Sequence, residues 1–105
     1  MNTFGISPQS FQLITDAFSQ YPQIESVVLF GSRAKGNYKN GSDIDLAIKG
    51  IECTNQFTEN IKAMLNEELN IPYHVDVVNY ETLSHLDLKA HIDRVGKEFH
   101  INHKL

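Results

Sequence analysis

The sequence has little cysteine and no long apolar run. Cys53 is the one cysteine among 105 residues, which excludes an intramolecular disulfide and a cysteine-rich zinc site. Apolar runs such as VVLF at 27–30 fall far short of the ~20 residues that a membrane span needs. The start of the chain lacks a basic stretch followed by an apolar one, so no signal peptide is visible. We therefore expect a reduced, soluble, cytoplasmic protein that does not enter the membrane.

Positive charge is also scarce. Nine Lys and Arg stand against thirteen Asp and Glu, which gives a net charge of −4. Free-standing nucleic-acid binders usually have a basic excess, so we expect no tight direct binding to nucleic acid. The five histidines lack a matching set of Cys or His at zinc-ligand spacing. Repeats and linkers are absent as well, and the length predicts a single domain over residues 1–105.

Helical and extended patterns alternate along the chain. Ser7-Pro8 is typical of a helix start, and apolar residues at helical spacing follow until Tyr21-Pro22. Asn40-Gly41 indicates a turn between two strands. Strands are predicted over 24–30, 43–48, 73–78 and 97–101; further helices are predicted from Thr54 or Asn55 to about Leu69 and over 86–95, the last closed by Gly96 at the C′ position. The order predicts an α/β (α+β) fold with a mixed β-sheet flanked by helices.

The segment Asp43-Ile44-Asp45 carries the first candidate site. Side chains at i and i+2 of a strand share a face, which places two carboxylates about 6–7 Å apart. Such neighbours repel each other, and a folded protein tolerates them mainly when a cation lies between them. Oxygen ligands favour a hard ion, Mg²⁺ or Mn²⁺, completed by water and substrate phosphate. The plainer alternatives are a turn-capping Asp43 and a solvated Asp45.

A third carboxylate, Asp76, lies between Val75 and Val77. Burying a charge there is costly unless it is paired or bound to metal. If its strand neighbours the one that carries Asp45, three carboxylates converge, as two-metal nucleotidyl transfer requires. The alternative is an acid exposed on the strand face. His74 shares that face by its i, i+2 spacing, and it could orient Asp76 or a water molecule.

Gly31-Ser32 directly follows a predicted buried strand. Glycine allows the backbone to approach a ligand closely, and the serine hydroxyl with the N–H groups of a following helical turn can hold a phosphate. Arg33, Lys35 and Lys39 supply positive charge nearby, unless they are only solubilising loop residues.

The combined pattern resembles the DNA polymerase β-type nucleotidyltransferase superfamily: Gly31-Ser32, ten residues, Asp43-x-Asp45 and a later strand Asp76. Gly-Ser-Arg-Ala-Lys-Gly and the small size resemble its minimal nucleotidyltransferase (MNT) branch, the antitoxins of HEPN/MNT toxin–antitoxin modules. The resemblance implies a polymerase β-like fold, ATP as donor, and Mg²⁺ (or Mn²⁺) at the three acids, which would also be the catalytic residues. Lys35 stands where many relatives have arginine, which keeps the charge but loses a bidentate phosphate contact. The candidate nucleotide-binding residues are Gly31, Ser32, Arg33, Lys35 and Ser42.

Two functions follow as hypotheses. The first, implied by the resemblance, is transfer of AMP from ATP to a tyrosine of a cognate HEPN ribonuclease toxin, with Asp76 activating the acceptor hydroxyl as base or metal ligand. The second is a non-catalytic, nucleotide-binding regulatory subunit that neutralises or completes a partner by binding it. Larger polymerase β-type transferases carry an extra helical domain, and little chain follows Asp76 here. Both hypotheses therefore predict a heteromeric complex with a small helical HEPN-type protein.

Overall fold

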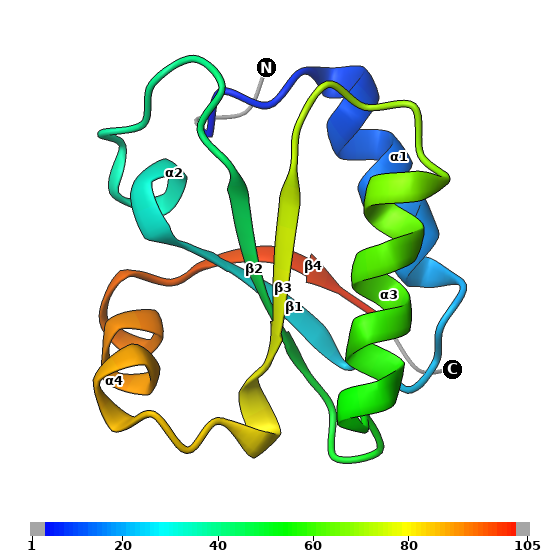
Figure 1. The fold of residues 1–105 in the computed structure, drawn as a ribbon, viewed down its shortest axis with the longest axis vertical. Coiled ribbons are helices and arrows are strands. Elements are labelled where there is room, and N and C mark those ends of the chain that lie inside the picture. Colours follow the sequence, from blue (N-terminus) through cyan, green and yellow to red (C-terminus); the bar gives the residue numbers. More distant parts are fainter. Residues whose placement is uncertain (1–3, 103–105) are drawn as a thin grey trace.

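The computed structural model describes residues 4–102 of the chain (Figure 1). Its elements follow the predicted order, with a short helix and a 3₁₀ turn added. They are α1 (Pro8–Ser19), β1 (Ser26–Phe30), α2 (Gly31–Lys35), β2 (Ile44–Lys49), α3 (Asn55–Glu67), β3 (Val75–Asn79), the 3₁₀ turn η1 (Tyr80–Thr82), α4 (Leu86–Val95) and β4 (Lys97–Ile101). No helix in this part of the chain is long and apolar enough to cross a membrane.

The strands form one mixed sheet in the order β3-β2-β1-β4. β1 pairs antiparallel with both β2 and β4, whereas β2 and β3 are parallel. The parallel pair requires a crossover connection, which α3 supplies. The predicted mixed sheet flanked by helices is confirmed, and β3 lies at one of its edges.

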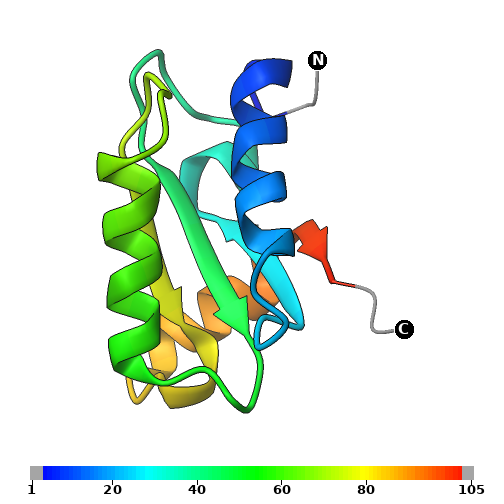
Figure 2. The same ribbon diagram turned by 90° about the vertical axis from the view of Figure 1, so that its right-hand side faces the viewer.

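Helices cover both faces of the sheet (Figures 1 and 2). α1 and α3 pack on one face, where Phe18 and Ile61 join the buried strand residues Leu46 and Val75 in the larger core cluster. α4 packs on the other face, where Ile92 meets a smaller apolar cluster. Side chains alternate between the faces of a strand. Asp45 follows Ile44 and Asp76 follows Val75, so both acids lie on the face that carries α4.

The helix starts agree with the sequence, but several boundaries differ from the predicted ones. Ser7 Oγ accepts a hydrogen bond from Ser10 N at 3.2 Å, and Thr54 Oγ1 accepts one from Phe57 N at 3.0 Å. The predicted strands 24–30 and 73–78 begin two residues late, at Ser26 and Val75, and α3 ends at Glu67 rather than near Leu69. Asp43 lies just before β2 and not within it.

The prediction that Gly96 occupies the C′ position of the last helix is wrong. It is the C-cap of α4 with φ −58°, and not a left-handed C′ residue. Space explains the glycine, because a Cβ there would come within 2.5 Å of Val28 Cγ1 on the neighbouring strand. The turn at Asn40-Gly41 is confirmed, with Gly41 at φ 85°.

Cys53 is buried, and its Sγ lies 3.4 Å from the Gln23 carbonyl oxygen. Burial, and then the negative charges of Glu81, Glu25 and Glu52, raise the pKa of this thiol. A thiol with a raised pKa stays protonated at neutral pH and is a poor nucleophile. Cys53 therefore belongs to the core and takes no part in the candidate site.

Candidate active site

The sheet register brings two of the predicted acids side by side. Asp45 in β2 is paired with Phe30, the last residue of β1, and on its other side with Asp76 in β3. Neighbouring strands are about 4.8 Å apart, and residues in register project to the same face. The expectation that the strand of Asp76 neighbours that of Asp45 is confirmed, and the two carboxylates share one patch of the sheet.

The Asp45 carboxyl has a raised pKa. Its partial burial raises the pKa most, and the negative charges of Asp76 and Asp43 raise it further, whereas Arg33 and His74 act in the opposite direction. Asp43 is exposed at the loop end that leads into β2. The charge of all three acids thus acts at one place, and a cation bound there would relieve the repulsion.

The donor chemistry of this patch fits a magnesium-type ion. Asp43 and Asp45 offer carboxylate oxygens, the ligands that Mg²⁺ and Mn²⁺ prefer. Among residues 4–102, no group of three or more His, Cys, Asp or Glu side chains is arranged to hold a metal ion. Mg²⁺ sites commonly use one or two carboxylates and take their remaining ligands from water and substrate phosphates. The two carboxylates therefore fit a site that a nucleotide completes.

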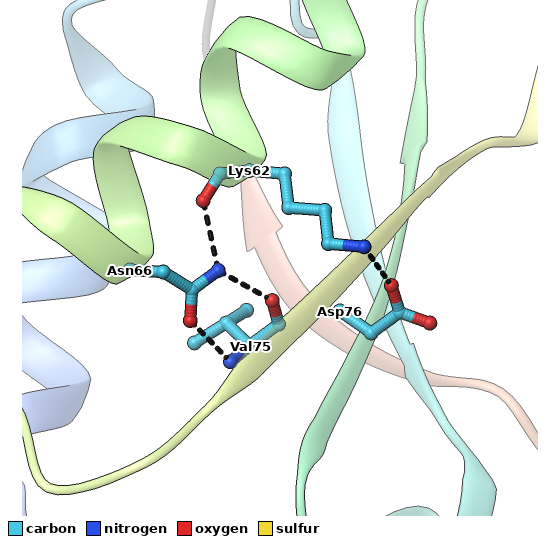
Figure 3. Close-up of polar contacts among 4 residues, drawn as sticks. All are labelled: Lys62, Asn66, Val75 and Asp76. Carbon is cyan, nitrogen blue, oxygen red and sulfur yellow. Dashed lines mark hydrogen bonds and ion pairs between the residues drawn. The ribbon is translucent and has the colours of Figure 1, made fainter.

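Asp76 has a partner that the sequence did not point to. Lys62 Nζ of α3 lies 2.9 Å from Asp76 Oδ1, with both side chains more than a third exposed at 37% and 42% (Figure 3). The hydrogen bond to Asp76, together with its negative charge, raises the pKa of Lys62. His74, which the sequence offered for this role, is exposed and lines a shallow depression of about 320 Å³ with Lys62 and Asn66. No motif marks Lys62, because the contact depends on how α3 lies against β3.

Gly31 packs directly against the Asp45 carboxylate. It opens α2 with φ 74°, a left-handed conformation that suits glycine, and a Cβ on it would collide with Asp45 Oδ2. Ser32 follows it and is partly buried, and Lys35 is exposed at the end of α2. The glycine predicted to allow a close approach thus lies directly against the central carboxylate.

We expect Gly31→Ala to destabilise the fold and to weaken metal-dependent nucleotide binding, since the new methyl group displaces the Asp45 carboxylate. Gly36→Ala is the matched control, because Gly36 has a similar φ of 85° with nothing within 4 Å of its Cβ position. Left-handed strain of about 1–2 kcal/mol is common to both variants. Thermal melts and titrations with an ATP analogue compare them. Equal effects of the two substitutions would show that the contact with Asp45 is unimportant.

The Arg33 side chain is buried, and its guanidinium is hydrogen-bonded within the protein. It is only 3% exposed, and its guanidinium donates to Ser42 O at 2.7 and 3.2 Å, to Phe4 O at 2.9 Å and to Gly5 O at 3.3 Å. The guanidinium carbon also lies 5.0 and 5.1 Å from the ring centroids of Tyr38 and Tyr73. These contacts fasten the loop over 36–43, which carries Asp43.

Ser42, the other loop residue predicted to bind nucleotide, is also engaged within the loop. Its Oγ accepts a hydrogen bond from Lys39 N at 2.9 Å, and its carbonyl oxygen is the acceptor for Arg33. Of the predicted nucleotide-binding residues, Gly31, Ser32 and Lys35 lie in α2; Gly31 packs against Asp45, Ser32 is partly buried and Lys35 is exposed. A sequence pattern cannot separate these residues from Arg33 and Ser42, because all five lie within one short segment, 31–42, and only the fold shows which of them the protein itself uses.

Arg33→Lys should lower the free energy of unfolding by about 2–3 kcal/mol. A single ammonium group cannot replace the guanidinium, which donates to Ser42 O on one side and to Phe4 O and Gly5 O on the other. Lys35→Met, two residues along and exposed, should leave the stability nearly unchanged. Urea unfolding of the two variants measures the difference. An Arg33→Lys protein as stable as the wild type would contradict the structural role.

The fold and the site define a class of protein. Gly31-Ser32 opens α2 directly after β1, Gly31 lies against Asp45, and Asp76 is in register with Asp45 on the neighbouring strand, as the sequence pattern of a nucleotidyltransferase predicts. The sequence profile of the family described as "Polymerase beta, Nucleotidyltransferase" matches residues 12–104. The chain belongs to this family and has its polymerase β-like fold.

Solved structures of similar fold include toxin–antitoxin complexes. A chain of a toxin–antitoxin structure with AMP-PNP is 23% identical over 87% of this chain and 70% of that one, with a TM-score of 0.66. A chain of a complex of tri-AMPylated HEPN toxin from Shewanella oneidensis with MNT antitoxin is 22% identical over 85% of this chain and 71% of that one, with a TM-score of 0.59. A chain of the toxin–antitoxin complex MntA-HepT is 22% identical over 84% of this chain and 70% of that one, with a TM-score of 0.58. Among curated protein sequences, none matches at a significant level.

Proposed function

We propose that this protein is a Mg²⁺- or Mn²⁺-dependent nucleotidyltransferase that moves AMP from ATP to a protein acceptor, a tyrosine of a small helical HEPN-type ribonuclease, and so acts as its antitoxin. The observation that carries the proposal is the packing of Gly31 against Asp45, with Asp76 beside it in register. Similarity to the complexes with AMP-PNP and with AMPylated HEPN toxin supports the choice of donor and acceptor.

Each site residue then has a chemical task. Gly31, Ser32 and Lys35 bind the triphosphate, and Asp43 and Asp45 provide the oxygen ligands for the metal ion, which supplies neutralisation of phosphate charge when it is bound. Asp76 accepts the proton of the acceptor hydroxyl. The acceptor oxygen forms a bond to the α-phosphorus while the bond to pyrophosphate breaks, with the attacking and leaving oxygens in line.

A partner is needed to complete this site. Asp43 is exposed and Asp76 is 42% exposed, so the acceptor side is open to water, which competes for the activated phosphate. Docking of a partner over the rim formed by 31–45 would exclude water and align the acceptor. The net charge of −4 suits a basic protein. We expect a stable heteromeric complex when the chain is coexpressed with a neighbouring HEPN-type gene, measured by size-exclusion chromatography.

The second candidate function is a nucleotide-binding subunit without catalysis. The ion pair between Asp76 and Lys62 favours it, because one oxygen of the proposed base is already occupied by Lys62. The double variant Asp43→Asn/Asp45→Asn distinguishes the two functions: neutralisation of the partner should be lost if AMP transfer causes it and kept if binding alone does.

Calorimetry with an ATP analogue that resists transfer tests the shared part of both proposals. Since the two carboxylates repel the phosphates without a cation, measurable affinity is expected only with Mg²⁺ or Mn²⁺ present. Nucleotide binding of equal strength in the presence of a chelator would overturn the site as described.

A further inference from the structure

The two sides of α4 use their polar side chains differently. On one side, Asp93 Oδ1 accepts a hydrogen bond from the Tyr80 hydroxyl at 2.6 Å, and Lys89 Nζ lies 4.9 Å from the centre of the Tyr80 ring. Tyr80 directly follows β3, whereas Asp76 lies near the start of that strand. This side of α4 is therefore engaged within the protein, at the end of the sheet away from the acids.

The other side of α4 borders the candidate active site. The His91 ring stands edge-on against the Phe30 ring, with 6.2 Å between the ring centres and an angle of 84° between the planes. Phe30 is the last residue of β1 and is in register with Asp45. Arg94 follows His91 by about one helical turn, so it shares this side of the helix. α4 packs against both β1 and α2, and Figure 1 shows α2 beside it.

The polar atoms of His91 and Arg94 are available to a ligand. Within residues 4–102, neither side chain takes part in a hydrogen bond or an ion pair, and no side-chain nitrogen is buried without a partner. His91 is half-buried and Arg94 is exposed. By contrast, His85 Nδ1 accepts a backbone hydrogen bond at the start of α4, and His100 lies 2.6 Å from Asn102 Oδ1. The His91 imidazole thus has its ring held by an aromatic contact while its nitrogens remain accessible.

The candidate site also needs more positive charge than its loop provides. The triphosphate of a nucleotide is best bound by several cationic donors besides the metal ion. Arg33, which the sequence offered, donates to backbone carbonyl oxygens of the protein itself. Lys35 remains, exposed at the end of α2. The next element beside α2 is α4, whose Arg94 carries the planar donor group that suits phosphate.

The direction of an in-line reaction indicates which phosphates lie beside α4. Asp76, Asp45 and Phe30 form one row across β3, β2 and β1. In the proposed function the acceptor hydroxyl enters at Asp76, and the leaving oxygen departs on the opposite side of the α-phosphorus. The leaving group therefore moves toward β1, the side on which α2 and His91 lie.

We propose that His91 and Arg94 bind the leaving pyrophosphate, which consists of the β- and γ-phosphates of ATP. The inference rests on the proposed function and adds two residues to its site. The acceptor oxygen bonds to the α-phosphorus while the bond to the pyrophosphate oxygen breaks, and the electron pair of that bond moves to the pyrophosphate. An N–H group of His91 donates to this group and the Arg94 guanidinium neutralises its charge, while the acceptor proton passes to Asp76.

The test uses variants that keep the packing of α4. His91→Phe keeps a ring against Phe30 and removes both nitrogens, and Arg94→Gln removes the charge of an exposed side chain. Lys89→Gln is the matched control, because it removes one positive charge from the opposite side of the same helix. Calorimetric titrations in the presence of Mn²⁺ compare three probes: inorganic pyrophosphate, AMP, and an ATP analogue with a methylene group between the α- and β-phosphates, which resists transfer.

His91→Phe and Arg94→Gln should each weaken binding of pyrophosphate and of the ATP analogue by about tenfold, the effect of one charge-assisted hydrogen bond. Their affinity for AMP should equal that of the wild type, since AMP lacks the two outer phosphates, and Lys89→Gln should match the wild type with all three probes. Unchanged pyrophosphate affinity in either variant would overturn the proposal, as would an equal loss of affinity for AMP. If His91→Phe does not fold, His91→Ala is judged by the same outcomes.

Failure of this inference is distinguishable from failure of the proposed function. A wild-type protein that shows no Mn²⁺-dependent affinity for the ATP analogue contradicts the nucleotide site and removes both. A wild type that binds the analogue and transfers AMP, beside His91→Phe and Arg94→Gln proteins of equal affinity, removes only the role of α4.

Discussion

Asp45→Asn is expected to lower nucleotidyl transfer by about a hundredfold to a thousandfold, and to raise the melting temperature of the metal-free protein. The two effects have one cause. Burial and the charges of Asp76 and Asp43 raise the pKa of the Asp45 carboxyl, which means that its ionised form is held at a free-energy cost in the fold. Asparagine keeps the shape beside Gly31 and removes the charge, so the repulsion and the metal ligand are lost together.

The stability gain of Asp45→Asn should depend on pH in a defined direction. Because the folded pKa is raised, the folded state binds more protons than the unfolded state between the ordinary aspartate pKa and the raised one. Wild-type stability therefore falls as pH increases through this window, and the variant is spared that loss. The difference in melting temperature should be largest at neutral pH and should vanish below the ordinary aspartate range. Metal binding should weaken as pH falls through the same window, since it needs the ionised carboxylate.

Melting curves with and without Mg²⁺ and an ATP analogue measure these effects. The wild type should gain stability from the two ligands together, and Asp45→Asn should not. Asp16→Asn is the control, since Asp16 lies exposed on α1 and bonds Gln12. An Asp45→Asn protein that melts below the wild type at neutral pH without metal would contradict the electrostatic reasoning.

Asp76→Asn is expected to separate binding from chemistry. The variant should keep most of the affinity for ATP, because Asp76 is held at the strand edge by Lys62. Its transfer rate should fall by about a hundredfold to ten-thousandfold, the contribution typical of a general base. The measurement is a kcat and KM comparison of Asp43→Asn and Asp76→Asn with the partner as acceptor.

The pattern of effects decides whether the acids have different tasks. Asp43→Asn should raise the KM for ATP and weaken Mn²⁺ binding, whereas Asp76→Asn should change kcat alone. Equal losses of nucleotide affinity in both variants would contradict the division of labour. The melting temperature of Asp76→Asn should change little, because a half-exposed ion pair contributes about 0–1 kcal/mol.

The sequence predicted the elements of this fold because its local signals agree with one another. Ser7-Pro8 and Thr54 begin helices, Asn40-Gly41 makes the turn, and the β-branched segments form strands. The sequence suggested that β3 neighbours β2 only as a condition for the acids to meet, and it did not predict that the two strands pair in parallel. The boundaries differ by about two residues because hydrogen bonding in the sheet, and not residue type, determines where a strand begins.

The roles of the charged residues could not be predicted in the same way. Arg33 reads as a phosphate ligand beside Ser32, yet its hydrogen-bond partners are the carbonyls of Phe4, Gly5 and Ser42, which the chain brings near only on folding. Lys62 reads as a solvent-exposed helix residue. Its contact with Asp76 depends on the packing of α3 along the edge of the sheet, which no local pattern encodes.

The intact mass of the HEPN-type partner after incubation with this protein, ATP and Mg²⁺ tests the central claim most directly. We predict that the partner gains mass in whole AMP units. A partner whose acceptor tyrosine is replaced by phenylalanine should gain none at that site. The double variant Asp43→Asn/Asp45→Asn should produce no gain. An unchanged partner mass with the wild-type protein, in a complex that still neutralises the partner, would contradict nucleotidyl transfer as the function of this site.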